Sequence, residues 1–270
     1  MSGVSTIGIL DSGVGGLSVV RAIRELLPDQ SIVYCADTAY FPYGLKSAEL
    51  IRKRAVYVGE MMARESGCSL LVIACHTMSA LCLDLIQQRV SCPVIGMIDP
   101  AINGLKRFVD QQNPKTIGII STRATQVSGV YRKSWPKISR DGATELYEYS
   151  LSSIVGIIEE GLIKGRELDA VVDALLPEKF KRSDALLLGC THFYGIIPSL
   201  QGILSPTTAI VDAATLVAEE IAIKFRSKLE REFSEQSPSF RVMVSDNPER
   251  FLQAAIHFGN FVIDDICVFT

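Results

Sequence analysis

The sequence predicts an α/β protein made of two quasi-symmetric, doubly wound domains with mainly parallel sheets. Three observations support this fold class. Short apolar runs typical of strands alternate with amphipathic helical segments along the chain. Two strand-and-loop patterns each occur twice, once in each half. With 270 residues, 48% of them hydrophobic, the chain can also bury a core in each half.

The first repeated pattern is an apolar strand that ends in a cysteine. Residues 70–74 (LLVIA) lead into residues 75–77 (CHT), and residues 186–189 (LLLG) lead into residues 190–192 (CTH). Continuous apolar runs of this length are typical of strands buried on both faces of a parallel sheet. Ligands bind beyond the carboxyl ends of such strands, so we expect both thiols at a functional site.

The second repeated pattern is a strand of alternating Ile and Gly that ends in polar residues. Residues 7–10 (IGIL) precede Asp11 and Ser12, and residues 117–120 (IGII) precede Ser121 and Thr122. Each half therefore contributes one polar strand end and one cysteine strand end. The cleft between the halves is the predicted site.

The individual elements follow from apolar spacing and from turn-forming residues at their ends. Strands are expected over residues 6–10, 31–35, 70–74, 93–98, 117–120, 145–149, 186–189, 209–212, 241–244 and 263–269. Helices, with apolar residues three and four apart, are expected over residues 17–27, 47–65, 78–89, 101–109, 152–164, 167–176, 213–232 and 248–258, and after Pro198. Asp99 and Pro100 are interpreted as a hinge between the halves.

Composition excludes several classes of partner. The formal net charge is −3, and no basic run or acidic tail is present, so neither nucleic acid nor a membrane surface is an expected partner. No apolar run approaches the roughly 20 residues of a membrane span, and the first residues do not resemble a signal peptide. The seven cysteines are odd in number and lack a C-x-x-C pair, which favours reduced thiols and a cytoplasmic protein.

The loop after the first strand is rich in glycine. Residues 11–16 (DSGVGG) do not have the G-x-G-x-x-G spacing of a dinucleotide site, and a small carboxylate suits them better than a pyrophosphate.

Three chemistries use cysteine and histidine in this arrangement. A zinc site could combine Cys75, His76, Cys190 and His192, but the closely spaced cysteine pair of structural zinc sites is missing. A Cys–His hydrolase would leave the second thiol unexplained. A two-base inversion next to a carboxylate uses both thiols, one as thiolate and one as thiol, because an unperturbed thiol has a pKa of roughly 8.5. This last scheme requires neither a cofactor nor a metal.

Six motifs in the same order resemble glutamate racemase, a cofactor-independent enzyme family that supplies D-glutamate for peptidoglycan. They are residues 11–17 (DSGVGGL), 37–39 (DTA), 42–44 (PYG), 74–75 (AC), 122–125 (TRAT) and 189–192 (GCTH). Residues 247–251 (NPERF) near the end are also similar to the family pattern. His192 favours glutamate over aspartate, because aspartate racemases of the superfamily tend to have Glu there.

The resemblance implies roles for particular residues. Cys75 would take the proton from D-glutamate and Cys190 from L-glutamate, with Asp11 and His192 assisting on their respective sides and Glu159 supporting His192. Other residues would hold the substrate through side-chain or backbone groups: Asp11, Ser12, Pro42, Tyr43, Gly44, His76, Thr77, Thr122, Thr191 and His192. The family fold implies a first domain of residues 1–98 plus 211–270 and a second of residues 99–210. A homodimer is the expected assembly.

The chain departs from the family pattern at several positions. His76 and Met78 stand where the family has Asn and Ala, and residues 193–195 (FYG) replace Tyr-Pro-Leu. Imidazole is larger than the Asn side chain and can carry charge, so it can alter substrate placement. Two alternatives to a glutamate racemase therefore remain open: a catalytically weakened amino-acid-binding or regulatory protein, and a racemase of a related acidic amino acid.

Overall fold

The computed structural model describes residues 6–139, 142–231, 237–259 and 261–270. Its strands form two sheets. The first sheet contains β1 (Thr6–Asp11), β2 (Ser31–Ala36), β3 (Leu70–Ile73), β4 (Val94–Gly96), β9 (Phe240–Val244) and β10 (Asp265–Val268). The second contains β5 (Thr116–Ser121), β6 (Glu145–Ser150), β7 (Ala185–Gly189) and β8 (Ala209–Asp212).

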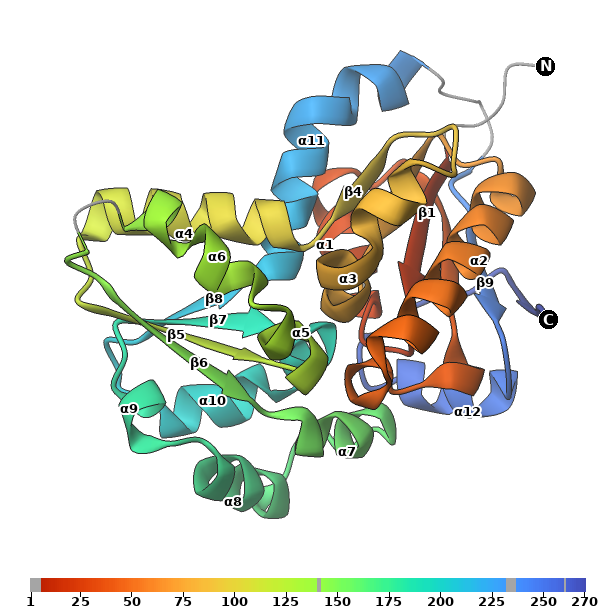
Figure 1. The fold of residues 1–270 in the computed structure, drawn as a ribbon. Helices are drawn as coiled ribbons and strands as arrows, with labels where there is room; N and C mark the ends of the chain where they lie inside the picture. Colours follow the sequence, from red (N-terminus) through yellow and green to blue (C-terminus); the bar gives the residue numbers. More distant parts are fainter. Residues whose placement is uncertain (1–5, 140–141, 232–236, 260) are drawn as a thin grey trace.

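All neighbouring strands in both sheets are parallel, and helices lie on both sides of each sheet (Figure 1). The α-helices are α1 (Leu17–Leu26), α2 (Ala48–Ser66), α3 (His76–Gln87), α4 (Ile98–Gln112), α5 (Arg123–Ser128), α6 (Val130–Ile138), α7 (Val155–Glu159), α8 (Arg166–Leu175), α9 (Glu178–Lys181), α10 (Ile197–Ile203), α11 (Ala213–Arg231) and α12 (Pro248–Ala255). The predicted doubly wound α/β class is confirmed.

The two sheets share one topology. The first has the order β10-β9-β2-β1-β3-β4 and the second has the order β6-β5-β7-β8, so β2-β1-β3-β4 corresponds strand for strand to β6-β5-β7-β8. In such sheets the connections leave in opposite directions on either side of β1 and of β5. The carboxyl ends of β1 and β3, and of β5 and β7, flank these switch points, where ligands bind.

Local sequence signals set several helix ends. Ser47 caps α2 by accepting a hydrogen bond from the Leu50 N–H, and Gly67 ends this helix in the left-handed conformation at φ 59°. Thr122 caps α5 in the same way, through the Thr125 N–H. Asn247 caps α12 through the Arg250 N–H.

The helices differ from the prediction in three places. Asp99 and Pro100, interpreted as a hinge, lie in the first turn of α4, which begins at Ile98, and proline loses no hydrogen bond there. The helix expected over residues 152–164 is a 3-10 turn (Ser152–Ile154) followed by α7, which ends before Gly161 at φ 83°. The sequence analysis also missed α6, which contains Pro136.

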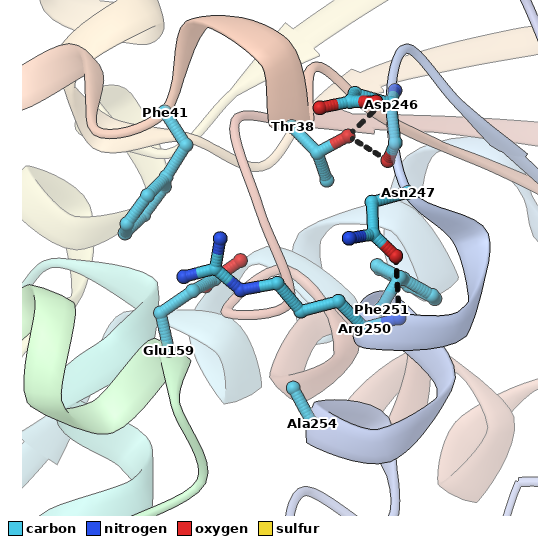
Figure 2. A pocket seen from close by; sticks show the side chains of 8 residues that line it. All are labelled: Thr38, Phe41, Glu159, Asp246, Asn247, Arg250, Phe251 and Ala254. Carbon is cyan, nitrogen blue, oxygen red and sulfur yellow. Dashed lines mark hydrogen bonds between the residues drawn. The ribbon is translucent and has the colours of Figure 1, made fainter.

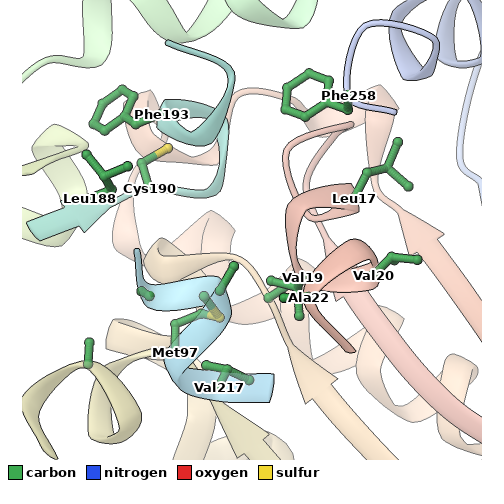
Figure 3. Close-up of a cluster of buried hydrophobic side chains, with 14 of the residues drawn as sticks. Leu17, Val19, Val20, Ala22, Met97, Leu188, Cys190, Phe193, Val217 and Phe258 are labelled. Atoms are coloured by element: carbon green, nitrogen blue, oxygen red, sulfur yellow. The ribbon is translucent and has the colours of Figure 1, made fainter. Parts of the chain in front are cut away.

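The apolar core connects the two halves. One cluster contains Leu17, Val19 and Val20 of α1, Leu188 of β7, and Val217 of α11 (Figure 3). The helix α11 lies against α1 and α4, and so bridges the first and second sheets. A second cluster fills the space between the first sheet and the pair α2 and α3.

The last part of the chain returns to the first sheet, since β9 pairs with β2 and β10 pairs with β9. The predicted division at residue 211 falls inside β8, and Leu187 and Leu188 of β7 pair with Val211 and Asp212. Those two residues therefore extend the second sheet. Within the described ranges, no helix combines the length and apolar character that a membrane span requires.

Candidate active site

A small, partly open cavity lies between the carboxyl ends of the strands in the two halves. It is lined by eleven of the predicted site residues and two others, Phe41 and Val155: Ser12, Phe41, Pro42, Tyr43, Gly44, Cys75, His76, Thr77, Thr122, Val155, Cys190, Thr191 and His192. Asp11 and Glu159 are buried behind this lining, where they contact Thr191 and His192. The structure thus gathers all the predicted site residues in one region.

Cys75 follows β3 and has an apolar, acidic environment. Its thiol, 7% exposed, lies 3.9 Å from the Ser12 hydroxyl. Burial and then the Asp11 carboxylate raise its pKa well above the usual value, and the Met78 N–H in the first turn of α3 partly offsets this rise. Cys75 is therefore a neutral thiol in the empty site.

Asp11 ends β1 and is fully buried. Its carboxylate accepts hydrogen bonds from the Gly13 N–H at 3.0 Å and from the Thr191 hydroxyl at 3.2 Å. Burial raises the pKa of Asp11 to about 6, although His192 acts in the opposite direction. This carboxyl group can therefore change its protonation state near neutral pH.

Cys190 follows β7 and has a basic environment. Its sulfur, 7% exposed, lies 3.9 Å from Nδ1 of His192, whose Nε2 lies 2.6 Å from Oε2 of Glu159. Burial disfavours a charge on His192, but its hydrogen bonds to Cys190 and Glu159 outweigh burial and raise its pKa well above 6.5. The imidazolium is thus the stable form between the sulfur and the carboxylate.

The glycine-rich loop after β1 binds a carboxylate of the protein itself. The Val14 N–H donates to both oxygens of Glu159, at 3.3 and 3.1 Å. Added Cβ atoms at Gly13 and Gly15 would lie 2.5 Å from Glu159 Oε1 and from His192 Nδ1. The Val14 N–H thus binds a small carboxylate, which is the side chain of Glu159 from the other half and not a ligand.

Three threonine hydroxyls connect the two halves on the other side of the cavity. Thr77 in α3 lies 2.9 Å from Thr122 and 3.3 Å from Thr125, and those two lie 3.0 Å apart. A Cβ atom at Gly44 would lie 2.6 Å from Thr122, so only glycine permits this approach. These hydroxyls can supply donors to an anionic ligand.

The loop after β2 contributes an aromatic wall. The Tyr43 hydroxyl donates to Asp37 at 2.5 Å, and Asp37 also binds Arg54 at 2.9 Å. The Tyr43 hydroxyl is therefore already used by Asp37, and only the backbone of Tyr43 is left for the predicted binding role. Phe41 lies with its ring centre 5.4 Å from that of His192. The sequence signal for Phe41 was its position among aromatics at a strand end.

His76 is 2% exposed, begins α3 and lines the cavity. Neither Nδ1 nor Nε2 has a hydrogen-bond partner among the residues that the structure describes. Burial lowers the pKa of His76 to about 3, so the ring is neutral and offers one donor and one acceptor. Buried polar groups are almost always paired, so this imidazole lacks a partner that a ligand could supply.

A second cavity lies on the other side of Glu159 (Figure 2). It is lined by Thr38, Phe41, Glu159, Asp246, Asn247, Arg250, Phe251 and Ala254. Arg250 forms an ion pair with Glu160, so α12 of the first sheet's half holds the end of α7 from the other half. Glu159, beside this ion pair, is thereby placed next to His192.

A metal is not needed to explain these contacts. In the parts of the chain that the structure describes, no group of three or more His, Cys, Asp or Glu side chains is arranged to hold a metal ion. The four residues considered for zinc are instead split between two environments. Cys75 lies beside Ser12, whereas Cys190 and His192 form a line that ends at Glu159.

Known proteins resemble the chain in sequence and in fold. A glutamate racemase of Corynebacterium diphtheriae is 36% identical over 259 residues, which cover 93% of each chain. A glutamate racemase structure from Francisella tularensis in complex with D-glutamate has a TM-score of 0.85 and 28% identity, and the match covers 100% of this chain and 98% of that one. An Escherichia coli glutamate racemase in complex with L-glutamate and the activator UDP-MurNAc-ala has a TM-score of 0.79 and 26% identity, with 97% of each chain covered.

The family model described as Asp/Glu/Hydantoin racemase matches residues 7–221. This range includes the strands, loops and helices that surround the cavity, from Asp11 to Asp212. Together with the identity to glutamate racemases over nearly the whole length, this match shows that the chain belongs to the aspartate/glutamate/hydantoin racemase family and, within it, to the glutamate racemases.

Proposed function

We propose that the protein interconverts L-glutamate and D-glutamate by proton transfer at the α-carbon, with Cys75 and Cys190 as the two bases. The observation that carries this proposal is that both thiols line one cavity and arrive there from equivalent strands of two halves with the same topology. A substrate between the halves would present its α-carbon to one sulfur on each side. Two glutamate racemase structures that resemble this chain hold D-glutamate and L-glutamate, respectively.

The chemical step moves one proton off the α-carbon and another onto it. With L-glutamate, the Cys190 thiolate takes the α-proton, the bonding pair remains on a flattened carbanion, and the Cys75 thiol returns a proton on the opposite face. The reverse direction starts from a Cys75 thiolate and a Cys190 thiol. Each turnover exchanges the protonation states of the two sulfurs, and no redox change or cofactor is involved.

The surroundings of the two thiols differ in charge. The imidazolium of His192, held by Glu159, lies beside Cys190 and stabilises negative charge there. Cys75 is kept neutral by burial and by Asp11. Asp11, with a pKa of about 6, can take up a proton when Cys75 is deprotonated.

Several groups that line the cavity can hold the substrate. The Ser12, Thr77, Thr122 and Thr191 hydroxyls and the backbone of residues 42–44 line the cavity and suit its carboxylates. The neutral His76 ring suits the α-ammonium group, to which an imidazole nitrogen can accept a hydrogen bond. Substrate binding would then give His76 the partner that it lacks.

The product defines the wider role. D-glutamate is a building block of peptidoglycan, which places the reaction in the cytoplasm, and the free cysteines suit a reducing compartment. A small-molecule substrate is the proposed partner, with no role for nucleic acid or membrane.

A homodimer is proposed as the assembly. Sedimentation equilibrium of the purified protein measures the assembly directly, and a purely monomeric protein would contradict it.

The test of the reaction uses the purified protein in heavy water. L-glutamate should lose its α-proton NMR signal while optical rotation decays to zero, and D-glutamate should behave in the same way. Aspartate, which is shorter by one methylene group, serves as the control substrate and should show much slower exchange. A folded protein that leaves the α-protons of both glutamate enantiomers intact would remove the proposal.

Two alternatives give different outcomes in the same experiment. The presence of His76 where the family has Asn favours a catalytically weakened binding protein. Such a protein would bind glutamate in calorimetry without exchanging its α-proton. A racemase of a related acidic amino acid would exchange that compound faster than glutamate.

A further inference from the structure

Cys68 and Cys92 form a pair of thiols outside the active site. Their sulfur atoms lie 3.9 Å apart. Cys68 precedes β3 and Cys92 precedes β4, and these strands are neighbours, with Leu71 paired to Val94. The cysteines therefore lie together at the amino-terminal edge of the first sheet, whereas Cys75 follows the carboxyl end of β3. The pair plays no part in the proposed racemisation.

From this juxtaposition we infer that Cys68 and Cys92 are a redox modification site, at which a peroxide converts the two thiols into a reversible disulfide. A disulfide requires a sulfur–sulfur distance of about 2.05 Å, so the sulfurs must approach each other by less than 2 Å. Both residues belong to connections outside the strands, since Cys68 lies between α2 and β3 and Cys92 lies between α3 and β4. Small rotations of these side chains and connections can bring the sulfurs together.

The two thiols differ in a way that suits such chemistry. Cys68 is 6% exposed, while Cys92 is half-buried. The hydrogen bond to Cys92 lowers the pKa of Cys68 to about 6 against the opposing effect of burial, and Ser66 contributes in the same direction. Cys68 therefore supplies the thiolate, and Cys92 supplies both its proton donor and a second thiol within reach.

The reaction balances with hydrogen peroxide as the oxidant. The Cys68 thiolate attacks one peroxide oxygen and breaks the O–O bond, which gives a sulfenic acid on Cys68 and a hydroxide that takes the Cys92 thiol proton and becomes water. The Cys92 thiolate then attacks the Cys68 sulfur and expels a second hydroxide, which takes up the proton that Cys68 had released and also becomes water. Two thiols are oxidised by two electrons in total, and the peroxide is reduced to two water molecules.

The test is peptide mapping of the full chain after peroxide treatment, alkylation and trypsin digestion without reduction. Cleavage after Arg64, Arg89 and Lys106 places Cys92 on residues 90–106 and Cys68, with Cys75 and Cys82, on residues 65–89. The inference expects these two peptides linked, with the link lost in Cys68→Ser and on reduction. Cys82→Ser is the matched control, because it removes another buried thiol of the same peptide and should retain the link.

Two results would overturn the inference. One is the absence of the linked peptides from the folded wild-type protein after peroxide; the other is a link that persists in Cys68→Ser, because Cys75 or Cys82 would then be the partner. A second variant checks the order of steps. In Cys92→Ser the sulfenic acid on Cys68 has no thiol to resolve it, so dimedone should label Cys68 at least about fivefold more than in the wild type. Equal labelling would contradict the roles given to the two thiols.

Discussion

Cys75 and Cys190 occupy equivalent positions after β3 and β7, yet their neighbours have opposite chemistry. Cys75 has Ser12 at 3.9 Å and the Asp11 carboxylate nearby, whereas Cys190 has His192 at 3.9 Å. The quasi-symmetry thus holds for the backbone, while the side chains around each sulfur differ. This difference allows one sulfur to be thiolate while the other is thiol, which a two-base inversion requires.

Replacing either thiol by Ala should remove racemisation, because each removes the only proposed base on one side of the α-carbon. Cys75→Ala and Cys190→Ala are each expected to lower kcat by about 10²–10⁴-fold or more. Polarimetry with L-glutamate and with D-glutamate measures the effect. Cys82→Ala, at a buried thiol outside the cavity, is the control and should retain activity. Undiminished turnover in Cys75→Ala or Cys190→Ala would contradict the scheme.

His76 should cost stability, since its buried imidazole has no hydrogen-bond partner among the described residues and pays the penalty of leaving water. His76→Leu is expected to raise the free energy of unfolding by about 1–3 kcal/mol and to raise KM for glutamate. Urea unfolding and initial rates give the two values. Met78→Leu, in the same helix, is the control and should change neither by much. A His76→Leu variant with lower stability would contradict the absence of a partner.

The contribution of His76 to stability depends on pH in the opposite direction to that of Asp11. The pKa of His76 is about 3 when folded and 6.5 when unfolded, so between these values the unfolded chain binds more protons and stability falls as pH falls. This contribution reaches about 1.4 kcal/mol per pH unit. Asp11, raised from 3.8 to about 6, acts oppositely, because its stabilisation is lost as pH rises through that range.

Unfolding free energies of the wild type and of His76→Leu, measured from pH 4 to 6, therefore should differ in slope. The wild type should lose stability as pH falls because of His76, and the variant should not. The free energy of unfolding of the variant should therefore exceed that of the wild type by more at pH 4 than at pH 6. Parallel curves for the two proteins would mean that His76 has an ordinary pKa in the folded state. That result would also remove the basis for a neutral His76 in substrate binding.

At the scale of elements, the connection between β1 and α1 joins the two halves. Its glycines leave room for Glu159 and His192, which come from α7 and from the turn after β7. The Val14 N–H holds Glu159, and Glu159 holds His192. The loop therefore positions His192, the proposed acid–base partner of Cys190, although His192 belongs to the other half of the molecule.

Gly15→Ala should impair catalysis without unfolding the protein. The new Cβ would lie 2.5 Å from His192 Nδ1 and 2.6 Å from the Thr191 hydroxyl, so one of them must move. We expect kcat to fall by at least about 10-fold, because a displacement of about 1 Å at a catalytic group can cost 10²-fold. The matched control is Gly156→Ala in α7, where nothing lies within 4 Å of the added atom. Full activity of Gly15→Ala would contradict this arrangement of the loop.

At the scale of the whole molecule, the cavity exists only because the two halves are held together. Its lining comes from both of them, as does the ion pair between Arg250 and Glu160. The shared apolar cluster around α1 and α11 fixes their relative position on the side shown in Figure 3. A ligand in the cavity should therefore stabilise both halves at once.

D-glutamate at about 100 times its Kd is expected to raise the free energy of unfolding by about 2.7 kcal/mol. Trp135, the only tryptophan, lies in α6 and reports on the second half, while far-UV circular dichroism reports on the whole chain. Both signals should shift to higher urea concentration together, and glycine at the same concentration is the control. A Trp135 transition that ignores D-glutamate would mean that the ligand binds only the first half.

The sequence by itself determined the strands, their parallel pairing and the residues that their carboxyl ends deliver. Buried runs such as residues 70–73 and 185–189 are set by local apolar pattern, and the repeated strand ends placed Cys75 and Cys190 in equivalent positions. The resemblance then added roles that no local pattern contains. Helix limits were less certain, as α4 and α7 show, because proline is accepted in a first turn and a left-handed glycine ends a helix early.

Only the tertiary structure decided which polar groups have partners. An acidic pair such as Glu159 and Glu160 is usually solvated, yet Glu159 is buried against Val14 and His192 while Glu160 remains exposed. The Tyr43 hydroxyl is used by Asp37, and His76 has no described partner. These outcomes depend on contacts between residues distant in the chain, because burial and hydrogen bonding are set by packing across the two halves and not by neighbours in sequence.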